Sequence, residues 1–374
     1  MGIGPETLAA ALTDVSDLDV FLERERTGEM GLVVEAALRR KGQHSLSSEP
    51  LQAQSVYERL GRISAIEGKE SEPRKIALLR GLFLEAAPLE GKYIARTALR
   101  NMLAGMGHRT MIDALAIALH CSREEIYRAY SLMPDLGNIA LMAKAGQLEK
   151  AAMHPKVPIR FMIFPRKEPK LPGAFLPKYP GLRVQVHKTK NEIRIFTSNL
   201  RDITSALNGL CRQLSRTNAD FVADADLIGF HDPGLSDEGD ICSQAEMLSY
   251  INRQRLSRKS SISPALLAYD LISLQGEDIC ALPYQDRRIE LLTILGPPQD
   301  MPFQGISPAR EKMLMDRDAV AEFLCQRKGA RALLERDPQA AYRPGQAVLG
   351  DFIIRARHSP CRTDPARMEK ICPG

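Results

Sequence analysis

The sequence is poor in aromatic side chains and contains no tryptophan. Only 5% of its 374 residues are Phe, Trp or Tyr, which disfavours a protein that binds single-stranded nucleic acid by stacking bases on aromatic rings. Long apolar runs are also lacking, so no segment is predicted to cross a membrane. The first residues have neither the basic start nor the apolar core of a secretory signal. We therefore expect a cytoplasmic protein.

Cysteine and histidine do not occur in the spacing of a metal site. The seven cysteines form no CxxC pair and the seven histidines form no HExxH pattern, so neither a zinc site nor a disulfide framework is predicted. His187 has no histidine or cysteine nearby and is expected on a strand surface. Any metal should be a hard cation held by carboxylates and phosphate.

The length and charge leave several classes open. A chain of 374 residues is long enough for two or three domains with separate cores. The formal net charge of +5 suits a protein that contacts phosphates, but many solvated surfaces carry the same balance.

Residues 1–153 are predicted to be all-helical. Apolar residues recur at spacings of three and four in 55–68, 73–86, 90–106 and 110–133, as on one face of a helix. Residues 2–38 and 105–143 form an internal repeat, in which a Gly-x-Gly start precedes an Ala/Leu-rich helix, an acidic helix and a turn that opens a third helix. Duplicated units of this kind are expected to stack into one curved core.

The second half has a different periodicity. Residues 154–175 are rich in Pro, Lys and Arg and are predicted to be an irregular domain linker. Beyond them, alternating apolar residues predict strands in 183–187, 192–196, 221–230 and 266–274, and helical patterns occupy 205–216 and 285–295. Residues 176–374 are therefore predicted to form a mixed α/β domain.

The order of motifs resembles that of ATP-dependent DNA ligases of the archaeal and eukaryotic type over residues 2–357. Residues 56–107, which begin VYERLGRISA and end RNMLAGMG, resemble the helical DNA-binding domain of those ligases. RVQVHKTKNEIRIFTSNLRDIT (183–204) and LLAYDLISLQGEDICALPYQDRRIELL (266–292) resemble their adenylation domain, a nucleotidyltransferase. The resemblance implies a multidomain protein with a helical DNA-binding domain followed by an α+β adenylation domain.

The resemblance implies that Lys178 is catalytic. In the family, the lysine of a KxDGxR motif attacks the α-phosphorus of ATP, and residues 178–183 read Lys-Tyr-Pro-Gly-Leu-Arg. Lys178, the glycine and Arg183, which is implied to bind the nucleotide, match, but Pro180 replaces the aspartate. Such a nucleophile needs burial or nearby positive charge to be neutral near pH 7. By itself, Lys178 would be an exposed lysine in a Pro-rich turn.

Further positions are implied to bind ATP and, in an active enzyme, Mg²⁺. Asp226 stands at the glutamate of the family's DGE motif, which positions the ribose and the metal, and Tyr269 stands where an aromatic ring stacks on adenine. Asp270 is implied as a weaker metal ligand. Without the resemblance, Asp224 and Asp226 would be the solvated face of an edge strand, and Tyr269 a core residue.

The last two motifs carry arginines. Arg336 matches the lysine that ends the EG motif, and Arg355 and Arg357 match a KxK motif; all three are implied to bind the nucleotide. Arg331 stands in place of a metal-facing carboxylate. Two unit charges about 4 Å apart interact by roughly 4 kcal/mol at an effective dielectric near 20, so this cation would oppose bound Mg²⁺.

The resemblance places DNA contacts in the first half. Residues 71–75 and 92–107 resemble segments that hold duplex phosphates across the minor groove, with close backbone approach at the two glycines. The implied DNA-binding residues are Arg74, Lys75, Lys92, Arg96, Gly105 and Gly107. The alternative is that the cations are the polar faces of amphipathic helices and the glycines a helix stop and start.

Two functions follow from the resemblance. In the first, the protein binds duplex or nicked DNA and its degraded adenylation site gives weak or no sealing. In the alternative, it is an active ATP-dependent DNA ligase that forms a lysine-AMP intermediate at Lys178 in DNA repair, replication or recombination. A third possibility is a decayed sequence without biochemistry. The family's C-terminal OB fold is expected to be absent, so a separate OB-domain or sliding-clamp protein is an expected partner. We expect a monomer.

Overall fold

The structure, a computed structural model, describes residues 3–42, 50–66, 68, 70–103, 105–165, 170–231, 241–255, 261–300, 303–327, 329–347 and 352–355. The chain divides into two compact units, residues 1–110 and 111–374, and each is described by itself. The predicted domain boundary at residue 153 would place the helices after residue 110 in the first domain as well. This boundary stays a prediction. No helix in the described ranges is long and apolar enough to span a bilayer.

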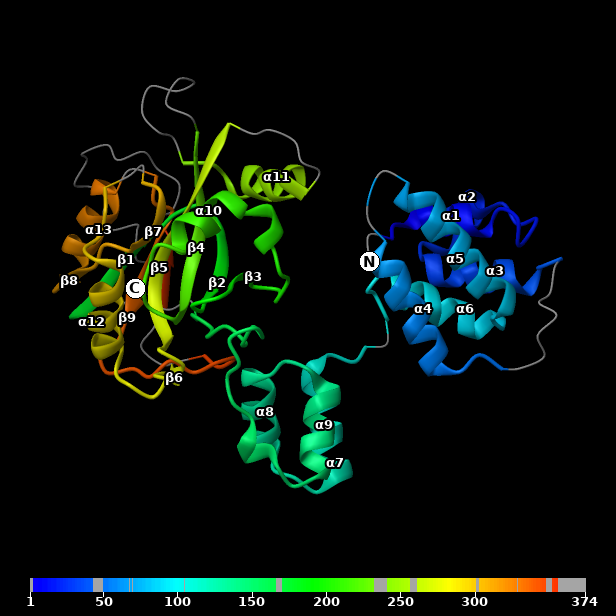
Figure 1. Ribbon diagram of the computed structural model, residues 1–374, viewed down its shortest axis with the longest axis horizontal. Coiled ribbons are helices and arrows are strands. Elements are labelled where there is room, and N and C mark those ends of the chain that lie inside the picture. Colours follow the sequence, from blue (N-terminus) through cyan, green and yellow to red (C-terminus); the bar gives the residue numbers. More distant parts are fainter. Residues whose placement is uncertain are drawn as a thin grey trace. The chain divides into compact units, whose positions relative to one another are not determined.

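The first unit is helical throughout its described part (Figure 1). Its helices are α1 (Pro5–Leu12), α2 (Val20–Thr27), α3 (Met30–Arg39), α4 (Ala53–Ala65), α5 (Ser71–Glu85) and α6 (Pro88–Ala98). Local sequence fixes several starts: Asp19 accepts hydrogen bonds from the N–H groups of Phe21 and Leu22 at the start of α2, and α6 begins at a proline. The apolar faces meet in a core that includes Leu12, Val34, Leu79 and Phe83. The helical prediction for this segment is confirmed.

Two glycines allow α3 and α6 to pack closely. A Cβ at Gly91 of α6 would collide with Leu38 and lie 3.1 Å from a methyl carbon of Val34, both on α3. A Cβ at Gly31 of α3 would lie 2.9 Å from Cγ of Arg96. A larger residue at either position would therefore push the two helices apart.

Three more helices follow, α7 (His108–Leu119), α8 (Arg123–Leu132) and α9 (Leu136–Lys144). The predicted repeat is visible in the helix order, since an acidic side chain caps the third helix of each copy: Glu29 caps α3 and Asp135 caps α9. The expectation of one core shared by both copies stays a prediction. The second copy buries Ile112, Ile126 and Ile139 in a separate cluster, because α8 packs against α9 and the 3₁₀ turn Leu148–Lys150.

Hydrogen bonds join α8 to the mixed α/β part of the second unit. The hydroxyl of Tyr127 donates to the carbonyl oxygen of Gly345 at 2.6 Å. The backbone N–H of Arg160 donates to the carbonyl oxygen of Ser131 at 2.8 Å. These contacts explain why α7–α9 group with the second unit and not with the helices that precede them.

Two sheets form the rest of the second unit. The larger has the order β3-β2-β4-β5-β6 with antiparallel neighbours, and β7 pairs with β5 in parallel; the smaller has the antiparallel order β10-β9-β1-β8. The strands are β1 (Gly173–Lys178), β2 (Leu182–Lys188), β3 (Ile193–Thr197), β4 (Phe221–His231), β5 (Ile262–Leu274), β6 (Glu277–Asp278), β7 (Gly305–Pro308), β8 (Lys312–Leu314), β9 (Ala332–Arg336) and β10 (Phe352–Arg355). The helices are η2 (Thr204–Ala206), α10 (Asn208–Leu214), α11 (Gln244–Arg255), α12 (Tyr284–Leu295) and α13 (Arg317–Gln326). The mixed fold and the four predicted strands are confirmed.

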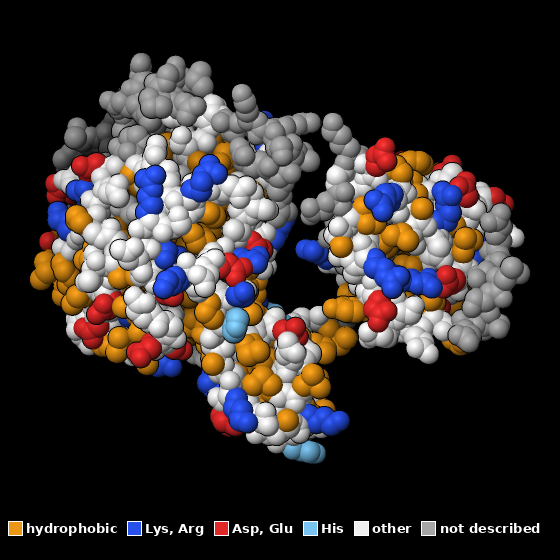
Figure 2. Space-filling model, in the orientation of Figure 1, with side chains coloured by type: hydrophobic (Ala, Val, Ile, Leu, Met, Phe, Trp, Pro, Cys, Tyr) orange, Lys and Arg blue, Asp and Glu red, His pale blue; other side chains and the backbone are white. Residues whose placement is uncertain are grey.

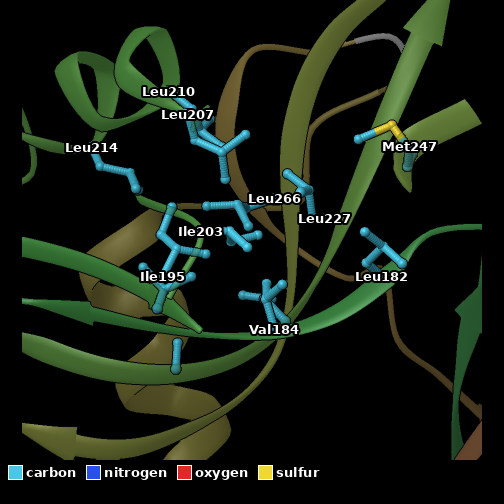
Figure 3. Close-up of a cluster of buried hydrophobic side chains, with 14 of the residues drawn as sticks. Leu182, Val184, Ile195, Ile203, Leu207, Leu210, Leu214, Leu227, Met247 and Leu266 are labelled. Carbon is cyan, nitrogen blue, oxygen red and sulfur yellow. The ribbon is translucent and has the colours of Figure 1, made fainter. Parts of the chain in front are cut away.

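The apolar faces of the larger sheet bury two different clusters. Figure 3 shows the first, in which Leu210 and Leu214 of α10 point toward Val184, Ile195 and Leu266 of the strands. The second cluster joins the two sheets and contains Leu176 of β1, Leu334 of β9 and Tyr269 of β5. This second cluster holds β1, and therefore Lys178, against β4 and β5.

The segment predicted as a linker is docked onto the sheet, and its last residues form β1. Gln185 of β2 accepts a hydrogen bond from the backbone N–H of Ile159 at 3.1 Å and donates one to its carbonyl oxygen at 2.8 Å. Nδ1 of His187 lies 2.9 Å from the carbonyl oxygen of Pro155. His187 is only 1% exposed, so the expectation of a surface histidine is wrong.

Among the described cysteines, Cys121, Cys211, Cys242 and Cys280 are free.

Candidate functional site

Lys178 ends β1 and lies in a compact polar cluster with Asp226 and Tyr269. Its Nζ donates to both carboxylate oxygens of Asp226, at 2.7 and 2.6 Å, and lies 4.5 Å from the centre of the Tyr269 ring. The hydroxyl of Tyr269 lies 3.1 Å from Oδ2 of Asp226, and burial together with that carboxylate raises the pKa of the phenol well above its usual range. The lysine side chain is 19% exposed and Asp226 only 3%, so solvent reaches the cluster from the lysine side.

A tight turn carries the chain from Lys178 into β2. A Cβ at Gly181 would lie 2.6 Å from the backbone oxygen of Leu227, so only glycine lets the turn pass this close to β4. Beyond the turn, β2 pairs with β4 so that Arg183 lies opposite Asp226. The glycine of the motif therefore has a steric role.

Arg183 forms a second ion pair, with Asp224. Nε of Arg183 donates to Oδ1 of Asp224 at 3.0 Å and Nη2 to Oδ2 at 2.5 Å. The hydroxyl of Tyr342 donates to the same carboxylate at 3.0 Å. Burial would lower the pKa of Arg183, but the charge and hydrogen bonds of Asp224 raise it. Arg183 thus stays cationic, at the edge of a cavity of about 340 Å³ lined also by residues 160–164 and Ser198.

Asp270 and Arg336 lie in a third, fully buried cluster. Asp270 accepts hydrogen bonds from Nε and Nη2 of Arg287, both at 2.9 Å, and from Nη2 of Arg336 at 2.5 Å. All three side chains are 0% exposed. Burial would raise the pKa of Asp270, but the charges of Arg336 and Arg287 hold it below its usual value. Asp270 and Arg336 thus bind each other. Their implied roles, as a metal ligand and as a nucleotide-binding residue, stay predictions without structural support.

The residues at the lysine do not fit a divalent cation. Within the described ranges, no three His, Cys, Asp or Glu side chains gather as metal ligands do. Asp226 is bound by Lys178 and Tyr269. The backbone N–H of Arg331 donates to the carbonyl oxygen of Lys178 at 2.8 Å, and the Arg331 side chain is exposed.

The cations predicted to bind DNA are partly engaged within the first unit. Nζ of Lys92 pairs with Glu35 at 3.0 Å, and Arg96 pairs with Glu29 at 3.1 Å. Lys75 is 8% exposed, whereas Arg74 is exposed. On this unit, positive and negative side chains lie side by side (Figure 2). Among these four predicted cations of the described chain, Arg74 is the one whose side chain is classed as exposed.

Sequence reasoning missed several residues that complete these arrangements. Gly105 and Gly107 are exposed, and the exposed cations Arg100 and Arg109 flank them. Tyr342 and Arg287 support Asp224 and Asp270, but no short motif marks them because their partners are distant in sequence. For Arg355 the structure describes only the backbone, on β10 opposite Ala332, and Arg357 lies outside the described residues.

Comparisons with known proteins agree with this architecture. Residues 1–116 match the family described as DNA ligase N terminus, and residues 170–346 match the ATP dependent DNA ligase domain. A DNA ligase of Methanothrix thermoacetophila is 30% identical over 92% of this chain and 64% of its own length. One of Methanocaldococcus jannaschii is 34% identical over 59% of this chain and 40% of its own length. The chain thus spans less than two thirds of these relatives.

Two solved structures have low similarity to part of the chain. The ligase domain of LigD from M. tuberculosis matches 52% of this chain and 59% of its own, with 20% identity and a TM-score of 0.39. The Chlorella virus DNA ligase-adenylate matches 52% of this chain and 67% of its own, with 14% identity and a TM-score of 0.38.

Proposed function

We propose that this chain, which belongs to the ATP-dependent DNA ligase family, binds duplex or nicked DNA and adenylates its lysine poorly. The observation that carries the proposal is the Lys178–Asp226 ion pair, in which both carboxylate oxygens hold the ammonium. Arg331, whose backbone N–H bonds to the carbonyl oxygen of Lys178, stands in place of the carboxylate of the family motif. Among the described residues, those beside Lys178 therefore form no site for the Mg²⁺ that is typical of the family.

The chemistry of adenylation explains why this arrangement is slow. The amine must lose a proton before its lone pair can attack the α-phosphorus of ATP, forming an N–P bond as the P–O bond to pyrophosphate breaks. Asp226, at 2.6 Å, is the nearest base for that proton, but both of its oxygens already bind the amine, so this ion pair must open before the lone pair can attack. Arg183 is already paired with Asp224, so the triphosphate must compete with a carboxylate for its guanidinium. Both ion pairs oppose the reactive state.

Incubation with α-labelled ATP and Mg²⁺, followed by a denaturing gel, tests the adenylation part. We expect substoichiometric label on the wild-type chain and none on Lys178→Ala. Restoring carboxylates with Pro180→Asp and Arg331→Glu should raise the labelled fraction about tenfold or more, because it removes a charge that opposes a metal. Stoichiometric label on the wild-type chain, unchanged by restoration, would contradict the proposal.

Duplex binding is the second part of the proposal. Arg74, Arg100 and Arg109 are exposed in the helical segments, and phosphate contacts make affinity fall as salt rises. We expect a 20-base-pair nicked duplex to bind in low salt, with log Kd rising linearly with log salt concentration. Each Arg→Ala substitution should reduce the slope by about one. Failure to bind at moderate ionic strength would overturn this part.

The alternative function is an active ligase of DNA repair, replication or recombination. The partial exposure of Lys178 favours it, because ATP can reach the amine once the ion pair opens. In that case an OB-domain or sliding-clamp protein would complete the enzyme. Sealing of nicked duplex by the chain with such a protein, but not by Lys178→Ala, would establish this alternative.

A further inference from the structure

A second cavity adjoins the candidate site but includes neither Lys178 nor Asp226. It has a volume of about 140 Å³ and lies beside residues 177–179 at the end of β1. Its polar lining consists of Tyr179, Gln299, Asp300, Arg310, Gln326 and Arg327. At roughly 30 Å³ for each water molecule, the volume equals that of four or five waters, which suits a small ion and not a nucleoside.

The two arginines give the cavity an anion-binding character. The guanidinium of Arg327 lies 5.0 Å above the ring of Phe323, which is 1% exposed and fixes its position. Nε of Arg327 is buried and has no hydrogen-bond partner in the described part of the chain. A buried donor of this kind is costly unless something accepts its hydrogen bond.

The second arginine is held only loosely. Arg310 pairs with Asp300 at 2.7 Å, but their side chains are 42% and 94% exposed, so solvent screens the pair and Asp300 is free to move away. Both guanidinium groups act on the Tyr179 hydroxyl: burial raises its pKa, and the charges of Arg327 and Arg310 oppose that rise. The residues that line this small volume thus include two arginines, a tyrosine and two glutamines, and the amide of Gln326 donates to Glu322 at 2.7 Å.

We propose that this cavity binds a small phosphate anion, with inorganic phosphate or pyrophosphate as the occupant. Planar guanidinium groups bind phosphate oxygens in a bidentate manner, and phenol and amide N–H or O–H groups add donors. The proposal does not depend on the proposed function, since no residue of the Lys178–Asp226 pair lines the cavity. It assigns Arg310, Arg327 and Tyr179 as ligands.

Calorimetric titration of the full chain with sodium pyrophosphate, and separately with sodium phosphate, tests the proposal at low ionic strength without divalent cations. We expect one saturable site for at least one of the two anions. Arg327→Gln should weaken binding about tenfold or more, as should Arg310→Gln. Tyr179→Phe, which removes a single donor and keeps the ring, should weaken it by a smaller factor and serves if an arginine variant does not fold.

Two control variants separate binding in this cavity from binding elsewhere on the chain. Arg253→Gln removes an exposed arginine on α11 and should leave the dissociation constant unchanged. Lys178→Met should also leave it unchanged, which distinguishes the cavity from the lysine site. Absence of saturable binding by both anions overturns the proposal, as does a loss of affinity in Arg253→Gln or Lys178→Met that equals the loss in Arg327→Gln.

Discussion

In the second unit one group of charges, Asp270 with two arginines, is closed to water, whereas the paired cations Lys92 and Arg96 of the first unit keep part of their surface in water. Arg287, Arg336 and Asp270 are 0% exposed. Lys92 and Arg96 keep 18% and 12% exposure in their pairs with glutamates of α3. Removing one member of a buried group leaves the others without water or a partner, whereas a surface cation can hydrate. Loss of one charge is therefore expected to destabilise the buried group of the second unit strongly and the helix surface of the first unit little.

The largest effect is expected from the buried group. Asp270→Ala leaves two buried arginines without their shared carboxylate and should lower the free energy of unfolding by about 3–5 kcal/mol. Asp300→Ala is the matched control, since this carboxylate pairs with an arginine but is 94% exposed. Urea unfolding followed by circular dichroism measures both. Equal, small effects of the two substitutions would remove the distinction between the interior and surface pairs.

A pH titration extends the comparison of buried and surface groups to a buried titratable side chain that has no oppositely charged partner among the described residues. Burial lowers the pKa of His187 from 6.5 to about 4. The unfolded chain therefore binds a proton between these pH values that the folded chain does not, so stability present above pH 6.5 is lost as the pH falls toward 4. At pH 5 the loss should be roughly 2 kcal/mol relative to pH 7.5. His187→Gln should lack this component in urea unfolding at the two pH values; an unchanged pH dependence would exclude His187 as its source.

The turn after Lys178 offers a test without charge. Gly181→Ala places a methyl group 2.6 Å from the backbone oxygen of Leu227 and should destabilise the fold by about 1–3 kcal/mol through overpacking. Gly107→Ala is the control, because nothing lies within 4 Å of a Cβ there. Thermal unfolding compares the two variants. If Gly181→Ala melted like Gly107→Ala, the steric role of the motif glycine would be refuted.

Much of the fold follows from local patterns in the sequence. Period-two alternation marks β2 and β4 because one face of each strand packs in the apolar core while the other carries polar side chains, most of which are buried as well, and the helices of the first unit carry recognisable apolar faces. β1 escapes such reasoning, since Pro177 lies within it and Pro172 directly before it, and prolines ordinarily argue against a central strand. Packing between the two sheets overrides that local preference.

The site was predictable only where its chemistry is carried by a motif. The resemblance identifies Lys178 and Asp226, which the structure brings within hydrogen-bonding distance. It does not identify Tyr342, which lies 118 positions from Asp224, or Arg287 of α12, and it implies a nucleotide role for Arg336 of β9 but not its contact with Asp270. These partners are set by tertiary packing, which a single sequence does not display. A single sequence does not show the exposure of a side chain either. Lys92, which is paired with Glu35, and Arg74, which is exposed, therefore look alike in the sequence.

The smallest expected effect tests whether surface pairing removes Lys92 from the DNA-binding surface. Because its ammonium is held by Glu35, Lys92→Met should change the free energy of unfolding by about 0–1 kcal/mol and the duplex dissociation constant by less than about twofold. Arg109→Ala, at an exposed cation, should weaken duplex binding more and reduce the salt slope by about one. Fluorescence anisotropy with a labelled duplex over a salt series measures both quantities. A slope reduced by about one in Lys92→Met would show that the Glu35 pair opens on DNA, so that the position predicted from the sequence, and not its pairing in the free protein, decides the contact.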